Sequence, residues 1–354
     1  MPTLSSKLGS WDLPHVHMWK DRKAQYSAAS RPLIQKGTSI ATIGSCFAAE
    51  LAHGIERLGL DGDMHPTGLF YNTASIRQEI ERIFGGWPAY REEPYWHTSQ
   101  GWVHPFKDAK RVFQSEDALR SWSDGLDQRA EQLFRNADVI VVTLGLIEAW
   151  RNPKNGNVYR QITHPDVFEA LHAEFFRLSV AEMRDDLEHI LGCVQANTRA
   201  KLVVTVSPVP LHATLTPNDV RVANTESKSR IRAAVSEFVE AHPEVTYFHS
   251  YELVSTAEKQ SDFMMEDGRH VHRHAVDYIL SEFLRLFGAG GVVAPEVDTS
   301  WLTAPEKTAA RIAKTPPSLA RRVLRRAKRE AKHLAEKLPE GVVKDLAHSA
   351  LKRG

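Results

Sequence analysis

A short apolar run that leads directly into a helix constrains the fold of this chain more than any other feature. Residues 38–44 are mostly β-branched and apolar, as in a buried strand of a parallel sheet. From Ala48 to Leu58 the apolar residues recur at helical spacing. Gly44 and Ser45 stand at the junction, where an open α/β sheet binds its ligands. The helix end also offers free N–H groups and a positive dipole, which suit a developing oxyanion.

Ser45 has two interpretations at this point. A serine that opens a helix is commonly an N-cap, whose hydroxyl accepts a hydrogen bond from the first helical N–H groups. The alternative is a nucleophile, which needs a base within reach and a third group that orients the base. Cys46 follows directly and is a competing nucleophile. The simpler interpretation of Cys46 is a small buried residue that packs the helix onto the sheet.

The same alternation of strand and helix continues along the chain. Further buried strands are predicted at 137–145, 201–208 and 245–249, and helices at 74–84, 116–135, 180–197, 223–241 and 278–287. Strands that alternate with helices of this length indicate βαβ units and a parallel sheet. Because such crossovers are right-handed, the prediction is a three-layer α/β/α sandwich.

Composition and charge divide the chain into four parts. We expect an N-terminal arm at 1–36, a catalytic domain at 37–290, a linker at 291–317 and a basic amphipathic helical tail at 318–354. Residues 306–354 hold 14 basic and five acidic residues, a net charge of +9, whereas the remainder carries −8. A helix of this kind can lie on an anionic membrane surface or hold a protein partner. The alternative is a solvated helix that folds back on the acidic body.

Several classes of protein are not expected. No run approaches the roughly 18 apolar residues that cross a bilayer, and the N-terminus lacks the apolar core of a signal peptide. We therefore expect a cytoplasmic protein that can bind the inner face of the membrane. The two cysteines are too few for a disulfide framework or a four-cysteine zinc site. His270, His272 and His274 alternate without completing a metal site, so no metal is expected. We also expect no cofactor and no nucleic-acid partner.

An aromatic segment at 85–115 is predicted to be a long irregular loop. It carries Trp87, Tyr90, Tyr95, Trp96, Trp102 and Phe106, punctuated by prolines. Loops of this length in compact domains are usually functional, and exposed aromatic rings suit stacking on a sugar. The alternative is a small satellite core beneath the loop.

A candidate base for Ser45 lies late in the chain. Asp267 and His270 are three residues apart across a turn that contains Gly268. The segment follows the last predicted strand and precedes the last helix, so it belongs at the same edge of the sheet as Ser45. That spacing lets one loop hold an imidazole with a carboxylate behind it.

These residues resemble the GSCFA family. That family looks like a branch of the SGNH/GDSL hydrolases. Residues 44–48 spell the five-residue signature that names the family. Further blocks follow in order at 66–72, 142–145, 205–210 and 267–278, and the resemblance covers roughly 37–287. It implies a flavodoxin-like parallel sheet and a serine acyl-transfer mechanism.

The resemblance also implies roles for individual residues. Ser45 would be the nucleophile, His270 the general base and Asp267 the group that orients the imidazole. The backbone N–H groups of Ser45 and Gly68 would hold the oxyanion.

One oxyanion donor of the wider superfamily is missing. Its Gly-x-Asn pattern is Gly145-Leu-Ile147 here, so the asparagine donor is absent from the loop of Gly145. Asn72 is our substitute because it lies in the loop of Gly68, although asparagine in such a loop often makes an Asx turn instead.

The sequence therefore predicts a serine esterase or O-acyltransferase acting on an acylated carbohydrate or similar polar ester. Its substrate would be a small molecule or a glycan ester. One alternative is a non-catalytic ligand-binding module on the same fold, because the asparagine donor is missing. A second alternative is a scaffold that binds a membrane or a partner through its basic tail.

Overall fold

The fold is known from a computed structural model, which describes residues 32–85, 95–108, 111–160, 169, 172–256, 263–268 and 271–297. The chain divides into two compact units, residues 1–299 and 300–354. All the described residues belong to the first unit. The predicted tail helix, His270 and most of the predicted N-terminal arm lie outside the described residues.

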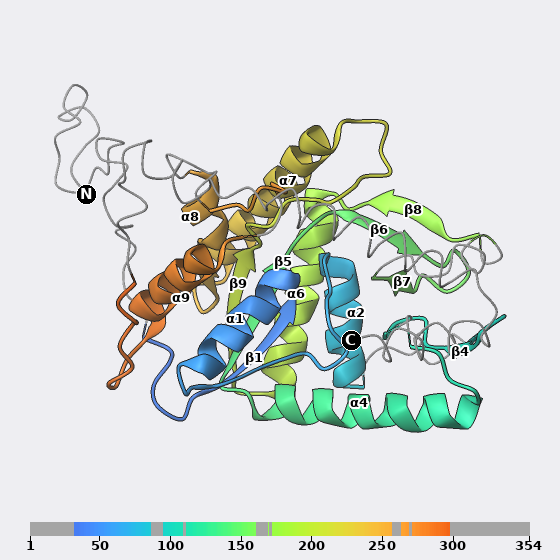
Figure 1. Cartoon of the computed structure of the whole chain (residues 1–354), viewed down its shortest axis with the longest axis horizontal. Helices are drawn as coiled ribbons and strands as arrows, with labels where there is room; N and C mark the ends of the chain where they lie inside the picture. Colours follow the sequence, from blue (N-terminus) through green and yellow to red (C-terminus); the bar gives the residue numbers. More distant parts are fainter. Residues whose placement is uncertain are drawn as a thin grey trace, which may run out of the picture. The chain divides into compact units, whose positions relative to one another are not determined.

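Five parallel strands form the central sheet (Figure 1). They are β1 (Ser39–Gly44), β2 (Asp61–Met64), β5 (Val139–Leu144), β9 (Lys201–Val206) and β10 (Thr246–Phe248). Their spatial order is β10-β9-β5-β1-β2, and every pairing is parallel. This is the strand order of the flavodoxin-like fold, in which the order reverses next to the first strand. The predicted parallel sheet is confirmed, and Ser45 follows the strand at which the order reverses.

Helices cover both faces of the sheet and complete the predicted three-layer sandwich. They are α1 (Cys46–Arg57), α2 (Thr73–Ile83), α4 (Glu116–Asn136), α6 (Val180–Asn197), α7 (Val220–Ala241), α8 (Ser250–Ser255) and α9 (Arg273–Phe287). One face packs Ile43, Val142 and Val204 against apolar side chains of α2, α4, α6 and α7. On the other face Thr42 donates to the carbonyl oxygen of Ala48 in α1 at 3.0 Å. The sheet is therefore buried on both sides, as its continuous apolar strands predicted.

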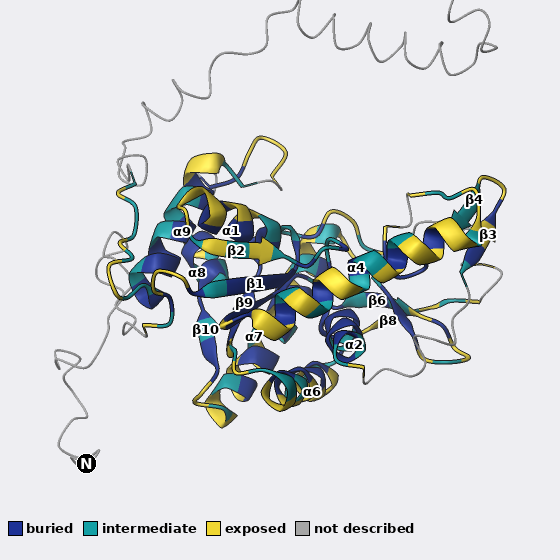
Figure 2. Cartoon of the chain, turned by 90° about the horizontal axis from the view of Figure 1, so that it is seen from below, coloured by how far each residue is buried: buried dark blue, intermediate teal, exposed yellow. Residues whose placement is uncertain are grey.

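Helix α9 lies beside α1 (Figures 1 and 2). A Cβ on Gly54 of α1 would be 2.6 Å from a methyl of Leu280 in α9, so these helices pack closely. At its end, α9 contacts the segment before β1, because the N–H groups of Leu33 and Ile34 donate to the carbonyl oxygen of Phe287 at 2.8 Å. Its last turn thus lies near the edge where β1 starts, which puts its first turn towards the edge where β1 ends.

Several elements differ from those predicted. The edge strand β2 was not predicted, because its sequence Asp-Gly-Asp-Met lacks the apolar pattern of a buried strand. Helix α9 contains the predicted helical segment 278–287 and begins earlier, at Arg273, and Ile34, before β1, is only 1% exposed. Beyond residue 290, the predicted start of the linker, Pro295 still accepts a hydrogen bond from the Ser281 hydroxyl at 3.0 Å.

Two small antiparallel sheets extend the fold beside α2 and α4. One is the hairpin of β3 (Trp96–Thr98) and β4 (Gly101–Val103), and the other joins β6 (Glu148–Arg151), β7 (Val158–Tyr159) and β8 (Glu174–Arg177). Trp96, Val103 and Phe106 pack with Tyr159 in a small core, which is the alternative interpretation of the aromatic segment. Figure 2 shows α4 with a buried and an exposed face beside this hairpin. No helix among the described residues is both long enough and apolar enough to cross a bilayer.

Candidate functional site

Ser45 stands at the end of β1 on a backbone that only glycine can provide. Gly44 has a φ of +140°, and a Cβ there would lie 2.1 Å from the carbonyl oxygen of Thr143 in β5. No other residue fits that space or adopts that conformation without strain. The glycine of the signature is therefore required by the close approach of β1 to β5, and it fixes where Ser45 begins α1.

Four hydrogen bonds hold Ser45 in place. Its Oγ accepts from the N–H of Phe47 at 3.3 Å, so it caps α1, and it lies 3.2 Å from the Oγ1 of Thr143. Its own N–H donates to the carbonyl oxygen and the Oγ1 of Thr143, at 3.1 and 2.9 Å. The side chain is 2% exposed. Ser45 is thus an N-cap, as one interpretation held, and Thr143 is a partner that the sequence did not reveal.

Gly145 lies against Ser45 from the end of the neighbouring strand. A Cβ on Gly145 would be 3.4 Å from the Cβ of Ser45 and 3.3 Å from the carbonyl oxygen of Tyr71. That oxygen accepts from the N–H groups of Gly145 and Leu146, at 2.8 and 3.0 Å. The structure therefore brings Ser45, Gly145 and the segment before α2 together at one edge of the sheet.

The loop that carries Gly68 runs beside the same edge. Gly68 has a φ of +94° and donates its N–H to the carbonyl oxygen of His65 at 3.1 Å. Two residues later the N–H of Phe70 donates to the carbonyl oxygen of Gly44 at 2.7 Å, which ties the loop to the end of β1. In this structure the two N–H groups that the resemblance assigns to the oxyanion, those of Ser45 and Gly68, each donate to a protein oxygen.

Asn72 caps α2 with its side chain. Its Oδ1 accepts from the N–H of Ser75 at 2.8 Å, and its Nδ2 donates to the carbonyl oxygen of Glu148 at 3.4 Å. The residue is 1% exposed. This is a local hydrogen-bonding role of the kind that the alternative interpretation of Asn72 described.

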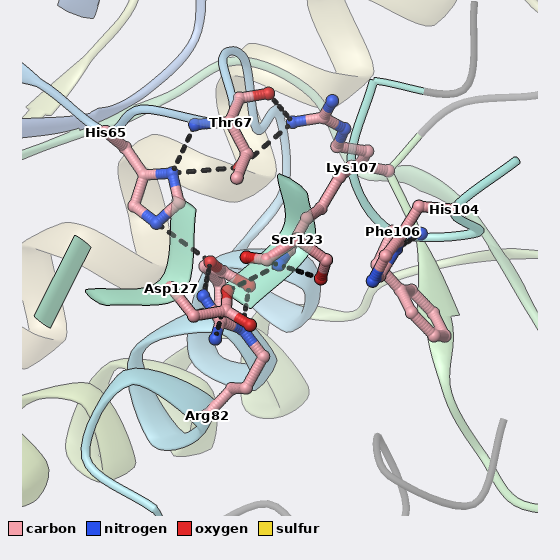
Figure 3. Close-up of polar contacts among 10 residues, drawn as sticks. His65, Thr67, Arg82, His104, Phe106, Lys107, Ser123 and Asp127 are labelled. Atoms are coloured by element: carbon pink, nitrogen blue, oxygen red, sulfur yellow. Dashed lines mark hydrogen bonds and ion pairs between the residues drawn. The ribbon is translucent and has the colours of Figure 1, made fainter. Parts of the chain in front are cut away.

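A buried polar cluster fixes the start of the Gly68 loop (Figure 3). The ring of His65 accepts from the N–H and hydroxyl of Thr67 at Nδ1, so its other nitrogen carries the proton and faces Glu79 at 2.8 Å. Arg82 pairs with Glu79 and, at 2.7 Å, with Asp127. Burial lowers the pKa of His65 although Glu79 opposes that shift, so the ring is neutral at pH 7.

The same cluster reaches helix α4 through a buried lysine. Lys107, 1% exposed, donates to Asp127 at 2.6 Å and to the carbonyl oxygen of Ser123 at 2.8 Å. Burial lowers its pKa, and Asp127 opposes that effect. Charged groups in so little water are stable only when each is paired, so this cluster couples α2, α4 and the Gly68 loop.

Lys228 is a residue of this region that sequence reasoning missed. It lies in the middle of α7 and is 1% exposed, and its Nζ donates to the carbonyl oxygens of Gly145 and Ser207, both at 2.8 Å. The preceding Ser227 accepts from the N–H of Ile147 at 2.9 Å. Burial lowers the pKa of Lys228 to about 7, while nearby Cys46 acts in the opposite sense. One turn of α7 thus holds the loops that follow β5 and β9.

Asp267 lies in the loop that precedes α9. This loop closes on itself, because the N–H of His272 donates to the carbonyl oxygen of Phe263 at 2.8 Å and Met264 pairs with Val271. Asp267 is exposed, and Gly268 has the positive φ, +65°, of a tight turn. Since α9 ends near the start of β1, the loop before α9 extends towards the edge that holds Ser45. The predicted base, His270, lies outside the described residues.

The profile of the GSCFA family matches residues 39–283, more than half of the chain. The chain belongs to the GSCFA family. The match begins with β1 and ends within α9, so the GSCFA region includes the whole parallel sheet and the loops described above. A search of curated proteins found no match to this GSCFA protein.

Two solved structures have a distant likeness to the GSCFA chain. One is a DUF4886 family protein from Bacteroides uniformis ATCC 8492, at 11% identity and a TM-score of 0.38, covering 80% of this chain and 98% of that one. The other is a carbohydrate esterase family 2 enzyme with a carbohydrate binding domain from Corynascus thermopiles (Myceliophthora fergusii), at 15% identity and a TM-score of 0.26. That match covers 64% of this chain and 58% of the esterase. At these scores neither likeness bears on function.

Proposed function

We propose that this GSCFA-family protein is a serine esterase or O-acyltransferase that acts on an acylated carbohydrate or similar polar ester. The observation that carries the proposal is the position of Ser45. It stands at the carboxyl end of β1, at the point where the strand order reverses, and at the amino end of α1. Ligands of this fold bind in the crevice at that point, and the helix dipole favours negative charge there.

In the proposed reaction the Ser45 Oγ attacks the ester carbonyl carbon while His270 takes the hydroxyl proton. The carbonyl electrons move to the oxygen, giving a tetrahedral oxyanion. When this intermediate collapses, the bond to the alcohol breaks and His270 returns the proton to the leaving oxygen. Water or an acceptor hydroxyl then removes the acyl group from Ser45 by the same steps. Asp267 holds the imidazole in the orientation that this requires.

Oxyanion binding requires the N–H groups of Ser45 and Gly68 to change partners. The N–H of Ser45 is shared between two acceptors of Thr143, so the substrate oxygen can replace the Thr143 hydroxyl without breaking the contact between β1 and β5. Catalytic hydrogen bonds are commonly formed only in the substrate complex. Gly68 has no Cβ, and within 4 Å of the position where a Cβ would stand lies the Nη1 of Arg160.

The second candidate is a non-catalytic binding module on the same fold. Two observations favour it: both proposed N–H donors already have acceptors, and Ile147 replaces the asparagine donor. Ile147 is 1% exposed and its N–H is bound to Ser227, so it offers nothing to an oxyanion. Loss of one such donor typically costs about 3 kcal/mol of transition-state stabilisation.

The two candidates separate when the protein is incubated with a short-chain aryl ester and with a fluorophosphonate probe. A serine hydrolase releases the phenol and carries the probe on Ser45, located by mass spectrometry of the peptide. Ser45→Ala should abolish both signals while the far-ultraviolet circular dichroism is unchanged, and Cys46→Ala should keep most activity. If the wild-type protein neither cleaves nor reacts, the binding module is the better description. If Cys46→Ala is the inactive variant, the nucleophile is a thiol.

A further inference from the structure

A cleft of about 470 Å³ is lined on one wall by the Gly68 loop. Gly68 lies on one wall, and Trp122 and Arg129 of α4 lie on another. The other charged residues that line the cleft are Asp108, Arg111 and Arg160. Its volume is in the range of small-molecule sites, about 300–1,000 Å³. We call it the arginine cleft.

Three guanidinium groups face one carboxylate in the arginine cleft, so it carries excess positive charge. The body of the chain is otherwise acidic, with a net charge of −8 before residue 306. Neither Arg111 nor Arg129 forms an ion pair within the described part of the chain, and both are exposed. Arginines without a carboxylate partner in a concave site favour an anionic ligand, because the planar guanidinium matches carboxylate and phosphate oxygens.

Two of the arginines are held in place before any ligand arrives. The Nη1 of Arg160 donates to the carbonyl oxygen of Thr67 at 2.5 Å, and its guanidinium lies 5.2 Å from the centre of the Phe70 ring. The guanidinium of Arg111 lies 5.4 and 5.2 Å from the ring centres of Phe113 and Trp122. Such packing already restricts these long side chains to few rotamers. Less side-chain entropy is therefore lost when a ligand binds.

The arginine cleft is joined to the candidate active site through Gly68. A Cβ on Gly68 would lie 3.9 Å from the Nη1 of Arg160, so the Gly68 backbone and the guanidinium are neighbours. Two residues on, Phe70 is hydrogen-bonded to Gly44, which precedes Ser45. Those steps place Gly68 within roughly 15 Å of Ser45 by backbone dimensions, a span that a mono- or disaccharide can bridge.

We propose that the arginine cleft binds an anionic group, a carboxylate or a phosphate, carried by the sugar whose ester Ser45 cleaves. The substrate class is then an acylated acidic carbohydrate, such as an acylated uronic acid or sugar phosphate. This inference rests on the proposed function for the role of Ser45, but the binding of the anion does not require turnover. Trp122, beside Arg111, supplies an apolar surface for the face of the sugar.

The first experiment compares two matched esters with the full-length protein. Acetate release is followed from mono-O-acetylated glucuronic acid and from mono-O-acetylated glucose, which differ in one carboxylate. The wild-type enzyme should have the lower KM for the glucuronate ester. Arg129→Gln should raise that KM about tenfold relative to the KM for the glucose ester, with kcat for the charged ester unchanged. The control is Arg135→Gln, also on α4, whose guanidinium pairs with Glu131 outside the cleft; it should leave the ratio unchanged.

The second experiment measures binding without chemistry. Calorimetry of full-length Ser45→Ala protein with glucuronate, and separately with inorganic phosphate, should show binding that weakens about tenfold when Arg129→Gln is added. Whichever ion binds more tightly identifies the anion. If the anions bind in a way that depends on Arg129 but the wild-type protein has no esterase activity, anion binding in the arginine cleft is supported and the proposed esterase function is wrong. The proposal for the arginine cleft is overturned if neither ion binds. It is also overturned if Arg129→Gln and Arg129→Glu leave the affinity for both ions unchanged.

Discussion

The Nζ of Lys228 and the carbonyl oxygen of Gly145 are joined by a buried hydrogen bond of 2.8 Å. The same nitrogen bonds the carbonyl oxygen of Ser207 at 2.8 Å, and burial lowers the pKa of Lys228 to about 7. A neutral amine has two N–H groups, one for each of these oxygens. Lys228 thus connects α7 to the two loops behind Ser45 in either protonation state.

Lys228→Met should destabilise the fold by about 2–4 kcal/mol, because two buried carbonyl oxygens lose their donor. The difference from wild type should grow as the pH rises from 7 towards 10. In that range the unfolded chain still binds a proton at Lys228, whereas the folded chain has released it. Each rise in pH therefore stabilises the folded wild-type protein relative to its unfolded state. Urea unfolding at several pH values measures both effects. A difference that is constant with pH would mean that the pKa of Lys228 is close to its ordinary value.

Gly44→Ala should unfold the protein or cost it more than about 3 kcal/mol. The new Cβ would overlap the carbonyl oxygen of Thr143 at a φ of +140°, so β1 and β5 would have to separate. Gly37→Ala is the matched control, because Gly37 also has a positive φ, +88°, but has no atom within 4 Å of its Cβ position. It should cost about 1–2 kcal/mol. Thermal unfolding compares the two variants; equal costs would show that only backbone strain matters at Gly44.

His270→Ala should lose ester cleavage about as completely as Ser45→Ala, because nucleophile and base act as one unit. Asp267→Asn should lose less. The controls are His272→Ala and His274→Ala, which alter neighbouring imidazoles at the start of α9. Initial rates on an aryl ester decide the matter. If one of the control variants is the inactive one, the base has been assigned to the wrong histidine.

Glu79→Gln should destabilise the protein at pH 7 by about 3–5 kcal/mol, the usual cost of breaking a buried ion pair. Burial would raise the pKa of Glu79, but Arg82 and His65 outweigh it and hold that pKa well below its usual range. A carboxylate with a lowered pKa stabilises the fold above pH 4.5 and loses this contribution as the pH falls below that value. The gap between wild type and variant should therefore narrow on acidification.

The control for Glu79 is Glu131→Gln, which removes an exposed partner of Arg135. Pairs of this kind contribute at most about 1 kcal/mol, so the variant should resemble wild type at every pH. Guanidinium unfolding between pH 3 and pH 7 provides the comparison. A Glu79→Gln gap that persists unchanged at pH 3 would contradict the role given to the ion pairs.

Removal of residues 300–354 should leave hydrolysis of a soluble ester intact and abolish salt-sensitive binding to anionic vesicles. The segment from 306 carries a net charge of +9, and each basic residue near an anionic surface contributes about 1 kcal/mol. The cut follows Thr299 so that Pro295 keeps its contact with α9. Vesicle sedimentation at low and high salt is the measurement. If the full chain does not bind the vesicles, or if the shortened chain is unfolded, the membrane hypothesis is wrong.

The sequence alone determined the layered α/β architecture and the position of Ser45. The strands β5 and β9 are continuous apolar runs, and α6 has the helical period from its first residue to its last, so local pattern was enough. Gly44 and Ser45 were recognisable because the apolar pattern changes from that of a strand to that of a helix within a few neighbouring residues. For the same reason the turn of Asp267 and Gly268 was placed directly before the last helix.

Only the tertiary structure decided the contacts between distant segments. The polar strand β2 exists because β1 offers it a partner, and Asn72 caps α2 and also donates to Glu148, 76 residues away. Lys228 carries no local signal that sets it apart from other lysines, although it is buried against Gly145 and Ser207. The arginine cleft gathers Arg111, Arg129 and Arg160 from three segments. Periodicity reports burial along one element, whereas pairing between elements depends on chain crossings that no local pattern records.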